Sequence, residues 1–364
     1  MEGQAASKQS TPDLKVNPEK LERFMGQMVG ELGAAMNAAL VLIGEKLGLY
    51  KAMAGSGAMT SAQLAKKTNT DERYVREWLS AQAAGGFITY DAATRSFILP
   101  DEQAFALALE DSPAYMPGAF QIISALMKDE PKILEAFRTS EGVGWDEHDA
   151  ALFEGTERFF RPNYAANLVS AWIPALDGVD AKLRAGARVA DVGCGHGAST
   201  ILMARGYPNS QFVGFDYHGP SIGWARRAAA RGGVTNAKFE VATAKDFHGA
   251  AYDFVTFFDC LHDMGDPVGA ASHVREMLTP DGAWMIVEPF AHDQLEKNLN
   301  PIGRMFFAAS TMICTPASRA QEVGLCLGAV AGEPRISRVV TEAGFQRFRR
   351  ATQTPFNIVY EARP

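Results

Sequence analysis

Apolar residues in the first part of the chain recur at helical spacings. Asn17 and Pro18 predict a helix start, because Asn suits the N-cap position and Pro the first helical position. This helix is expected to reach Gly30 or beyond. A second apolar series, which Gly48 ends, has spacings of four, three and four and so marks one face of another helix: Met36, Leu40, Ile43 and Leu47.

The next segment predicts a winged helix. The residues TSAQ, beginning at Thr60, form a capping box that opens a short helix, and a second helix begins after Asn69 and Thr70. Gly85 and Gly86 then lead into FITY and FIL, two short apolar runs around a polar turn, which predict a β-hairpin. Helix, turn, helix and hairpin follow one another in the order of a winged helix.

The rest of the chain changes from a helical to an alternating pattern. From residue 105 to about 176 it is helical, with predicted breaks at Pro113, Pro117, Pro131, Pro162 and Pro174. From residue 179 strands alternate with helices, which predicts a doubly wound α/β sheet. Its strands are RVADV, QFVGFD, KFEVAT, YDFVTFF and AWMIVEP, followed by an antiparallel hairpin of QRFRRAT and FNIVYEA.

We therefore expect a Rossmann-like mixed seven-stranded sheet with flanking helices, preceded by a mostly helical winged-helix domain. The expected boundaries are 1–17 for a flexible tail, 18–100 for the winged helix, 101–178 for a helical connector and 179–364 for the α/β domain.

Composition limits the possible partners. The 35 basic and 42 acidic residues give a net charge of −7, so a general attraction to nucleic acids or anionic membranes is not expected. The apolar runs are far shorter than the roughly 20 residues that span a bilayer, and the N-terminus lacks a hydrophobic signal region. These features predict a cytoplasmic protein without a membrane segment. The cysteines show neither a disulfide framework nor zinc-ligand spacing, so no metal is expected: Cys194, Cys260, Cys314 and Cys326.

The segment RVADVGCGHGAST, residues 188–200, predicts a cofactor-binding strand-turn-helix. A strand ends in Asp191 and runs into Gly193, Gly195 and Gly197, which permit positive φ angles and a close approach to a ligand. Gly193, Gly195 and Ala198 also fit the permissive dinucleotide fingerprint, so a nicotinamide-dependent oxidoreductase is an alternative. Asp191 favours S-adenosylmethionine, because a carboxylate repels a pyrophosphate and attracts the ammonium group of an amino-acid cofactor.

Five motifs in order resemble the class I S-adenosylmethionine-dependent methyltransferases, and this resemblance covers about half of the chain. DVGCGHG resembles the loop that wraps the methionine part of the cofactor. VGFD places Asp216, followed by Tyr217, where the family acid accepts the ribose hydroxyls. VATAKDF places Thr243 and Ala244 at the adenine position, where the family usually has an acid. YDFVTFFDCLHDMGDP and LTPDGAWMIVEP resemble the fourth motif and the fifth strand.

The resemblance implies S-adenosylmethionine as cofactor and S-adenosylhomocysteine as product. It also places Asp259 at the carboxyl edge of the sheet, facing the cofactor or the substrate. The winged helix with its helical connector is similar to that of the two-domain small-molecule methyltransferases, including many O-methyltransferases. This similarity implies a small-molecule acceptor, O-methylation in preference to N- or S-methylation, and a homodimer through the N-terminal domain.

The acceptor site is predicted from fewer residues. LHDMGDP resembles the segment in which plant-type O-methyltransferases carry a catalytic His, and the imidazole of His262 can accept a hydroxyl proton near neutral pH; a structural role is the alternative. Further candidates before the α/β domain are Trp145, Arg161 and Tyr164, where a helix pair anchored by the tryptophan is the alternative. Met305 and Phe306 are candidates in a long insertion, where an ordinary dimer helix is the alternative.

A DNA-binding regulator with a methyltransferase-like sensor domain is a further alternative. The second helix of the winged helix carries two arginines among three acids, so it is not basic: Arg73, Arg76, Asp71, Glu72 and Glu77. A DNA reader needs a positive face to neutralise phosphates. Binding to nucleic acid is therefore not expected.

Overall fold

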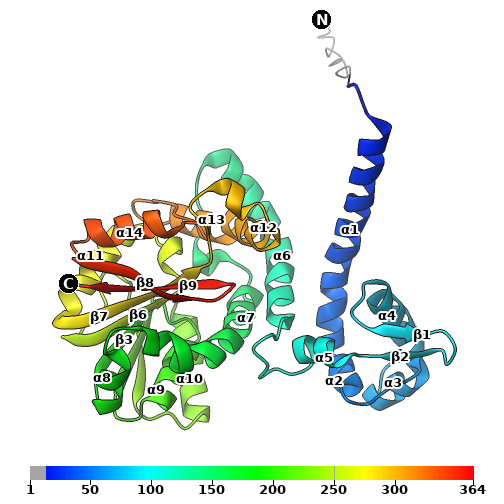
Figure 1. Cartoon of the computed structure of the whole chain (residues 1–364), viewed down its shortest axis with the longest axis horizontal. Helices are drawn as coiled ribbons and strands as arrows, with labels where there is room; N and C mark the ends of the chain where they lie inside the picture. Colours follow the sequence, from blue (N-terminus) through cyan, green and yellow to red (C-terminus); the bar gives the residue numbers. More distant parts are fainter. Residues whose placement is uncertain (1–13, 250) are drawn as a thin grey trace, which may run out of the picture. The chain divides into compact units, whose positions relative to one another are not determined.

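The computed structural model describes residues 14–249 and 251–364, so most of the predicted flexible tail lies outside the described residues. The chain forms two compact units, and the boundary between them in the sequence lies between Pro100 and Asp101 (Figure 1). Each unit is described by itself below.

The N-terminal unit has the predicted winged-helix order of elements. Its elements are α1 (Pro18–Lys46), α2 (Leu49–Met53), α3 (Ser61–Thr68), α4 (Glu72–Ala84), β1 (Thr89–Asp91) and β2 (Ser96–Ile98). Asn17 caps α1 by accepting a hydrogen bond from the backbone N–H of Lys20, and Thr60 and Gln63 form the predicted capping box of α3. β1 and β2 pair antiparallel as the wing.

The sequence predicts two helices in the region that α1 occupies, but the structure has only one. This helix has 29 residues, and Gly26, Gly30 and Gly33 lie on its exposed part. A glycine weakens a helix by only about 1 kcal/mol relative to alanine, so glycines alone do not end it. Its second half is held by α4, because Trp78 donates a hydrogen bond to the carbonyl of Leu40.

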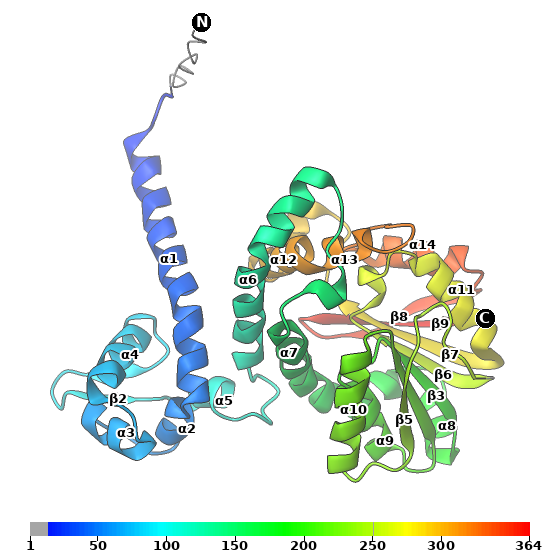
Figure 2. The same cartoon turned by 180° about the vertical axis from the view of Figure 1, so that it is seen from behind.

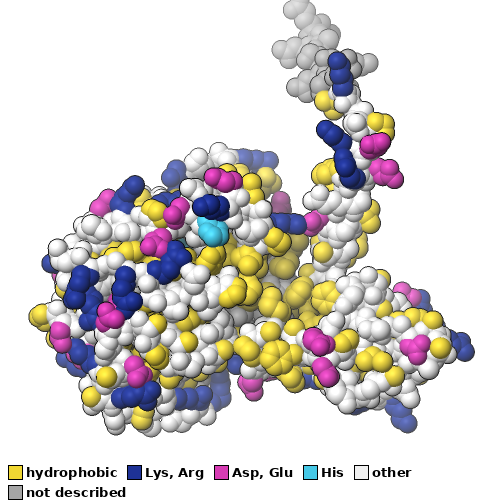
Figure 3. All heavy atoms as spheres, in the orientation of Figure 1, with side chains coloured by type: hydrophobic (Ala, Val, Ile, Leu, Met, Phe, Trp, Pro, Cys, Tyr) yellow, Lys and Arg dark blue, Asp and Glu magenta, His cyan; other side chains and the backbone are white. Residues whose placement is uncertain are grey.

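The length of α1 also corrects the prediction of no segment long enough for a membrane. By length and composition alone, α1 is long and apolar enough to cross a bilayer. Only 17% of its most apolar 18-residue stretch is buried. One such helix is weak evidence for a membrane. Figure 3 shows apolar side chains along the visible face of this helix. The large apolar side chains exposed on it are Leu21, Phe24, Met25, Met28, Val29, Leu32, Met36 and Ile43.

The second unit begins with α5 (Asp101–Leu107), α6 (Pro117–Thr139) and α7 (Ala151–Asn167). Pro131 lies inside α6 and Pro162 inside α7, so the predicted breaks at these two prolines are wrong. Each proline removes one backbone hydrogen bond, but tight packing of the two helices offsets this loss. A Cβ atom at Gly118 would lie 2.6 Å from the backbone nitrogen of Phe159 on α7, which shows how closely the helices approach.

Seven strands form the predicted mixed sheet, in the order β5-β4-β3-β6-β7-β9-β8 (Figures 1 and 2). Strands β3 to β7 are parallel, and β9 runs antiparallel to both β7 and β8. The strands are β3 (Arg188–Val192), β4 (Gln211–Asp216), β5 (Ala237–Val241), β6 (Tyr252–Phe258), β7 (Leu278–Pro289), β8 (Arg347–Gln353) and β9 (Asn357–Arg363).

Helices cover both faces of this sheet. On one face pack α8 (Val179–Ala185), α9 (Ala198–Gly206) and α10 (Gly219–Arg231), and on the other pack α11 (Pro267–Met277) and α14 (Glu333–Glu342). Alternate residues of each strand enter the two cores: in β3, Val189 belongs to one core, and Ala190 and Val192 to the other. The insertion between β7 and α14 carries α12 (Pro301–Ala309), a π-helical turn (Ser310–Cys314) and α13 (Thr315–Arg319).

The sequence predicts that the loop after β3 needs glycine because its backbone adopts positive φ angles. Gly193, Gly195 and Gly197 have φ angles of 73°, 51° and 81°, which confirms that prediction. A Cβ atom at Gly197 would lie 2.7 Å from the ring of Phe239. We expect Gly197→Ala to lower the free energy of unfolding by roughly 2–4 kcal/mol, because it adds both backbone strain and a clash.

Gly219→Ala is the matched control, since Gly219 also opens a helix after a strand but has no atom within 4 Å of the added Cβ. It should change the free energy of unfolding by less than about 1 kcal/mol. Chemical denaturation of the three proteins measures both effects. Equal destabilisation by the two substitutions would show that the glycine loop is not strained.

Candidate functional site

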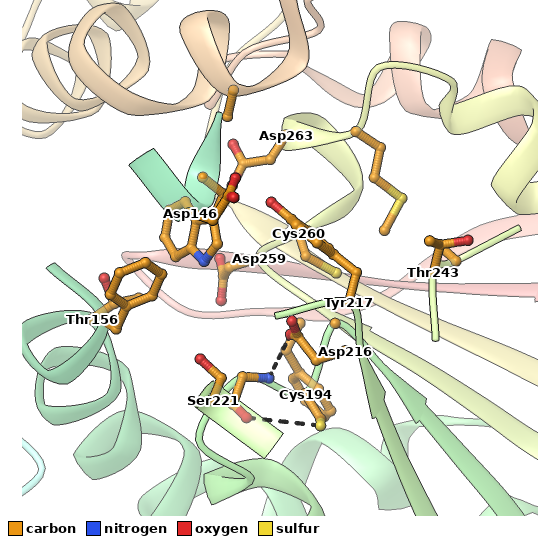
Figure 4. Close-up of a pocket in the computed structure, with 18 of the residues that line it drawn as sticks. Asp146, Thr156, Cys194, Asp216, Tyr217, Ser221, Thr243, Asp259, Cys260 and Asp263 are labelled. Atoms are coloured by element: carbon orange, nitrogen blue, oxygen red, sulfur yellow. Dashed lines mark hydrogen bonds between the residues drawn. The ribbon is translucent and has the colours of Figure 1, made fainter. Parts of the chain in front are cut away.

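A cavity of about 430 Å³ lies at the carboxyl ends of β3, β4 and β6, all within the second unit. The loop after β3, the end of β4, the loop after β5 and the segment after β6 form one side of it. Side chains from α7 and the turn before it form the other side. Figure 4 shows Asp259 near the middle of this cavity, Asp146 and Asp263 on one side, and Cys194 and Ser221 on the opposite side.

Asp216 joins the end of β4 to the glycine loop. Its carboxylate accepts one hydrogen bond from the backbone N–H of Gly195 and another from that of His218, both at 2.9 Å. Burial raises the pKa of Asp216 above its ordinary value. Two hydrogen bonds leave further lone pairs on the carboxylate, so Asp216 can accept hydroxyl groups from a ligand in the cavity.

Asp191 does not lie in the cavity, in contrast to the prediction that it faces the cofactor's ammonium group. It is buried and accepts hydrogen bonds from the hydroxyls of Ser199, Thr200 and Thr256, at 2.7, 2.6 and 3.0 Å. Burial raises the pKa of Asp191 to about 6, although these hydroxyls lower it. The carboxylate therefore ties β3 to α9 and β6 and supports the glycine loop from behind.

The predicted adenine residues line the cavity together with Tyr217. Thr243 donates its hydroxyl to Asp246 at 2.8 Å, and the same oxygen accepts the backbone N–H of Lys245 at 3.2 Å. Ala244 offers backbone groups to the cavity. Asp246 itself is not among the lining residues, so an acid does not stand directly at this position.

Asp259, directly after β6, lies at the centre of a network that spans the site. It accepts the hydroxyl of Tyr164 at 2.7 Å and the side-chain N–H of Asn357 at 2.8 Å. Burial raises the pKa of Asp259 to about 7, the Tyr164 hydrogen bond lowers it, and the charge of Glu288 raises it. Asp259 therefore changes its charge near neutral pH.

His262 does not line the cavity, and its geometry does not support the predicted role as general base. Its Nδ1 lies 2.5 Å from a Glu288 carboxylate oxygen and its Nε2 lies 3.2 Å from Oδ1 of Asp263. Burial lowers the pKa of His262, but the two carboxylates outweigh burial and hold that pKa well above its ordinary value. An imidazolium already carries a proton on each ring nitrogen, and here each nitrogen faces a carboxylate. It cannot take a further proton from the hydroxyl group of a substrate. Asp263 is the member of this group that lines the cavity.

The predicted substrate residues divide into two groups. Trp145 and Tyr164 line the cavity. Arg161 does not line the cavity, and its guanidinium pairs with Glu157 at 2.9 Å. Met305 and Phe306 also lie outside the lining and pack in an apolar cluster of the insertion, as the alternative of ordinary packing predicts.

Sequence analysis did not single out the other side chains of α7 that line the cavity. Together with the predicted Tyr164 they recur at spacings of three and four along one helix face, a signal that was present in the sequence: Phe153, Thr156, Glu157 and Phe160. The ring of Trp145 packs edge-on against Phe153, and Phe153 stacks on His218. Together Trp145, Phe153, Phe160 and Tyr164 give this side of the cavity an aromatic wall.

Among its charged side chains, the cavity is lined mainly by acidic groups. Seven carboxylates line it: Asp146, Glu157, Asp216, Asp259, Asp263, Asp266 and Glu322. Lys245 is the one lysine among the described lining residues, and it pairs with Asp266 and Glu322 at 3.1 and 2.7 Å. Burial lowers the pKa of His196 to about 4, so this residue adds no positive charge. The cavity therefore favours cationic ligands over anionic ones.

Two family models match the chain in this order. Residues 35–109 match the Rv2258c-like winged HTH domain, and residues 183–327 match a methyltransferase domain. The chain is also 30% identical over 104 residues to the ubiquinone biosynthesis O-methyltransferase of Actinobacillus pleuropneumoniae. That match spans 27% of this chain and 43% of the length of that protein.

Solved structures of two-domain methyltransferases are similar over nearly the whole chain. Mitomycin 7-O-methyltransferase has a TM-score of 0.70 at 17% identity, covering 96% of this chain and 100% of that one. An O-methyltransferase family protein from Burkholderia thailandensis has a TM-score of 0.67 at 18% identity, covering 96% and 99%. Human N-acetylserotonin methyltransferase, solved with S-adenosylmethionine, has a TM-score of 0.62 at 14% identity, covering 96% and 99%.

These structural likenesses have low identity and concern the fold, whereas the family models match the sequence itself. Both agree with the order of elements and the sheet topology described above. The chain therefore contains a winged helix-turn-helix domain followed by a methyltransferase domain of the class I fold, the S-adenosylmethionine-dependent class that the sequence motifs predict.

Proposed function

We propose that the protein transfers the methyl group of S-adenosylmethionine to a hydroxyl group of a small-molecule acceptor and releases S-adenosylhomocysteine. One observation carries this proposal: a single cavity joins the glycine loop and Asp216 to an apolar, aromatic wall on α7. The first side suits a nucleoside with an amino-acid tail, and the second suits a flat acceptor. The similarity to O-methyltransferases supports a hydroxyl as the methylated group.

On the cofactor side, Asp216 would accept the ribose hydroxyls, and Thr243 and Ala244 would face the adenine. Gly193 and Gly195 would let the backbone approach the methionine part, where a side chain would obstruct it. The acidic lining suits the positively charged sulfonium, whereas it would repel the pyrophosphate of a dinucleotide. This charge pattern speaks against the nicotinamide alternative.

On the acceptor side, the reaction needs alignment, exclusion of water and a group that takes the hydroxyl hydrogen. Phe153, Phe160 and Trp145 would align the acceptor and exclude water. Asp263 presents a carboxylate to the cavity: its Oδ1 is fully buried against His262, but 22% of its side chain is exposed. We assign to Asp263 the hydrogen-bond-accepting role that the sequence predicts for His262.

The alternative of a DNA-binding regulator is not favoured by the N-terminal unit. Both arginines of the predicted recognition helix form ion pairs along α4, Arg73 with Glu77 and Arg76 with Glu72. Pairing with these acids reduces the positive charge that a phosphate backbone would need.

The exposed apolar side chains of α1 support association with a second copy of the chain, and we propose a cytoplasmic homodimer. Met25 and Leu32 are both more than half exposed on this helix, and Met36 is 72% exposed. A contiguous apolar face of this length is unusual on a monomer in water.

The cofactor proposal is tested by calorimetry with S-adenosylhomocysteine. The wild-type protein should bind it, and Asp216→Ala and Asp216→Asn should weaken binding by at least about tenfold, because each removes acceptors for the ribose hydroxyls. Asp281→Asn is the matched control, since Asp281 is an exposed carboxylate paired with Lys182 and does not line the cavity. No binding by the wild-type protein would contradict the proposed cofactor. Release of S-adenosylhomocysteine from a panel of phenols, amines and thiols then identifies the acceptor.

The pKa of about 7 at Asp259 predicts a pH-dependent affinity for S-adenosylmethionine. A cationic ligand favours the ionised carboxylate, so affinity should rise by about tenfold as the pH increases from about 6 to about 8. Glu288, His262 and Asp263 also act on this carboxylate through their charges. Asp259→Asn should remove the rise, and Tyr164→Phe should move it to higher pH by removing a hydrogen bond that lowers the pKa.

S-adenosylhomocysteine, which lacks the sulfonium charge, is the control ligand in this titration. Its affinity should depend less on pH than that of S-adenosylmethionine. Identical profiles for the two ligands, or an unchanged profile in Asp259→Asn, would show that Asp259 does not sense the charge of the cofactor.

The homodimer is tested by light scattering after size-exclusion chromatography. The wild-type protein should have twice the mass of the 39.3 kDa chain, and the double variant Met28→Glu, Leu32→Glu should be monomeric. Tyr74→Glu is the control, because Tyr74 is also a large exposed side chain, 81% exposed, but belongs to α4 and not to α1. A wild-type monomer, or dissociation by Tyr74→Glu alone, would contradict dimerisation through α1.

A further inference from the structure

Three side chains of different chemistry meet beside the cavity, whose wall includes the second of them: the imidazole of His262, the carboxylate of Asp263 and the thiol of Cys314. One ligand atom from each lies within 4.8 Å of the others. His262 and Cys314 are buried, with exposed fractions of 3% and 6%. Nitrogen, oxygen and sulfur donors in one buried place are the donor set of a borderline-soft divalent ion such as Zn²⁺.

The fold holds these donors in place from two segments that are distant in the sequence. His262 and Asp263 lie on the short turn Leu261–Asp263, and Cys314 ends the π-helical turn Ser310–Cys314. Hydrogen bonds join the first turn and the residue after it to the chain that follows the second turn: the backbone N–H of Gly328 donates to the carbonyl of His262, and the Ser318 hydroxyl donates to the carbonyl of Met264. π-helical turns are rare and frequently mark functional positions. This separation explains why cysteine spacing in the sequence predicted no metal.

Glu288 completes the arrangement from the far side of the ring. Its carboxylate lies 2.5 Å from Nδ1 of His262, which fixes the ring and leaves Nε2 directed at Asp263. Metal-binding histidines commonly donate their second N–H to a carboxylate in this way. Oδ1 of Asp263 is buried and has no hydrogen-bond donor among the described residues, although Nε2 lies 3.2 Å away.

A simple ion pair of His262 with its two carboxylates is the competing explanation. It accounts for Glu288 and Asp263, but it gives no reason for a thiol at the same point. Burial raises the pKa of Cys314 to about 12, so the thiol is protonated where no cation stands beside it.

We propose that His262 Nε2, Asp263 and Cys314 bind one zinc-class divalent ion, which replaces the protons on Nε2 and on the thiol. Three protein ligands leave a fourth position in a tetrahedral site. Because Asp263 lines the cavity, the ion lies at the cavity wall, next to the place proposed for the acceptor. This site does not depend on the methyl-transfer proposal, and its test needs neither cofactor nor acceptor.

The test titrates Zn²⁺ and Co²⁺ into the full-length protein after removal of metals with a chelator. The wild-type protein should bind one equivalent of Zn²⁺ with a Kd below about 1 μM and release about two protons per ion, measured by calorimetry in buffers of different ionisation enthalpy. Cobalt should show the visible bands of a tetrahedral site and a near-ultraviolet thiolate band.

Cys314→Ser should remove the thiolate band and weaken zinc binding by at least about tenfold, and Asp263→Asn should weaken binding without removing that band. Cys326→Ser is the matched control, because Cys326 lies in the same insertion but outside the cluster. Circular dichroism and the thermal unfolding midpoint of each variant show separately that the chain is folded. Absence of zinc binding by the wild-type protein, or equal binding by Cys314→Ser, would overturn the proposal.

Discussion

The buried carboxylate of Asp191 is the constraint on which the cavity depends. Gly193, Gly195 and Gly197 after β3 adopt positive φ angles, and such a loop keeps its shape only when the surrounding elements hold it. Asp191 supplies that support by accepting hydroxyls from α9 and from β6 at once. The loop then places the N–H of Gly195 on Asp216, so the positions of β3, β4 and β6 are all linked through two carboxylates.

Among the described residues, the carboxylates of Asp191 and Asp259 have no positively charged side chain as a hydrogen-bond partner. Burial raises the pKa of both Asp191 and Asp259, to about 6 and about 7, which means that their ionised forms are unfavourable in the protein alone. For Asp191 the sign is definite: the folded protein holds its proton more tightly than the unfolded chain, so its contribution to stability falls as the pH rises from about 4 to about 6. A cation in the cavity would stabilise the ionised form of Asp259, which lines it, and a ligand that binds the folded state stabilises that state.

Periodicity and turn chemistry were sufficient to predict most of the fold, but not its continuity. The strands, the capping box at Thr60 and the glycine conformations follow from local sequence, whereas α1 continues through Gly30, and α6 through Pro131, because packing outweighs a local preference. In the site, motif position correctly placed Asp216 and Asp259 in the cavity. It could not show that Asp191 and His262 are enclosed by hydroxyls and carboxylates, since those partners come from other elements.

The contact of Asn357 with Asp259 has a consequence for how the site forms during synthesis. Asn357 begins β9 and also accepts a hydrogen bond from Asn163 on α7, so the last strand of the sheet joins the two sides of the cavity. The glycine loop leaves the ribosome well before this strand does. A nascent chain that has not yet released β9 therefore lacks the hydrogen bonds through which Asn357 holds Asp259 and Asn163 of α7 together, and the two sides of the cavity are linked in this way only after β9 has paired with β7.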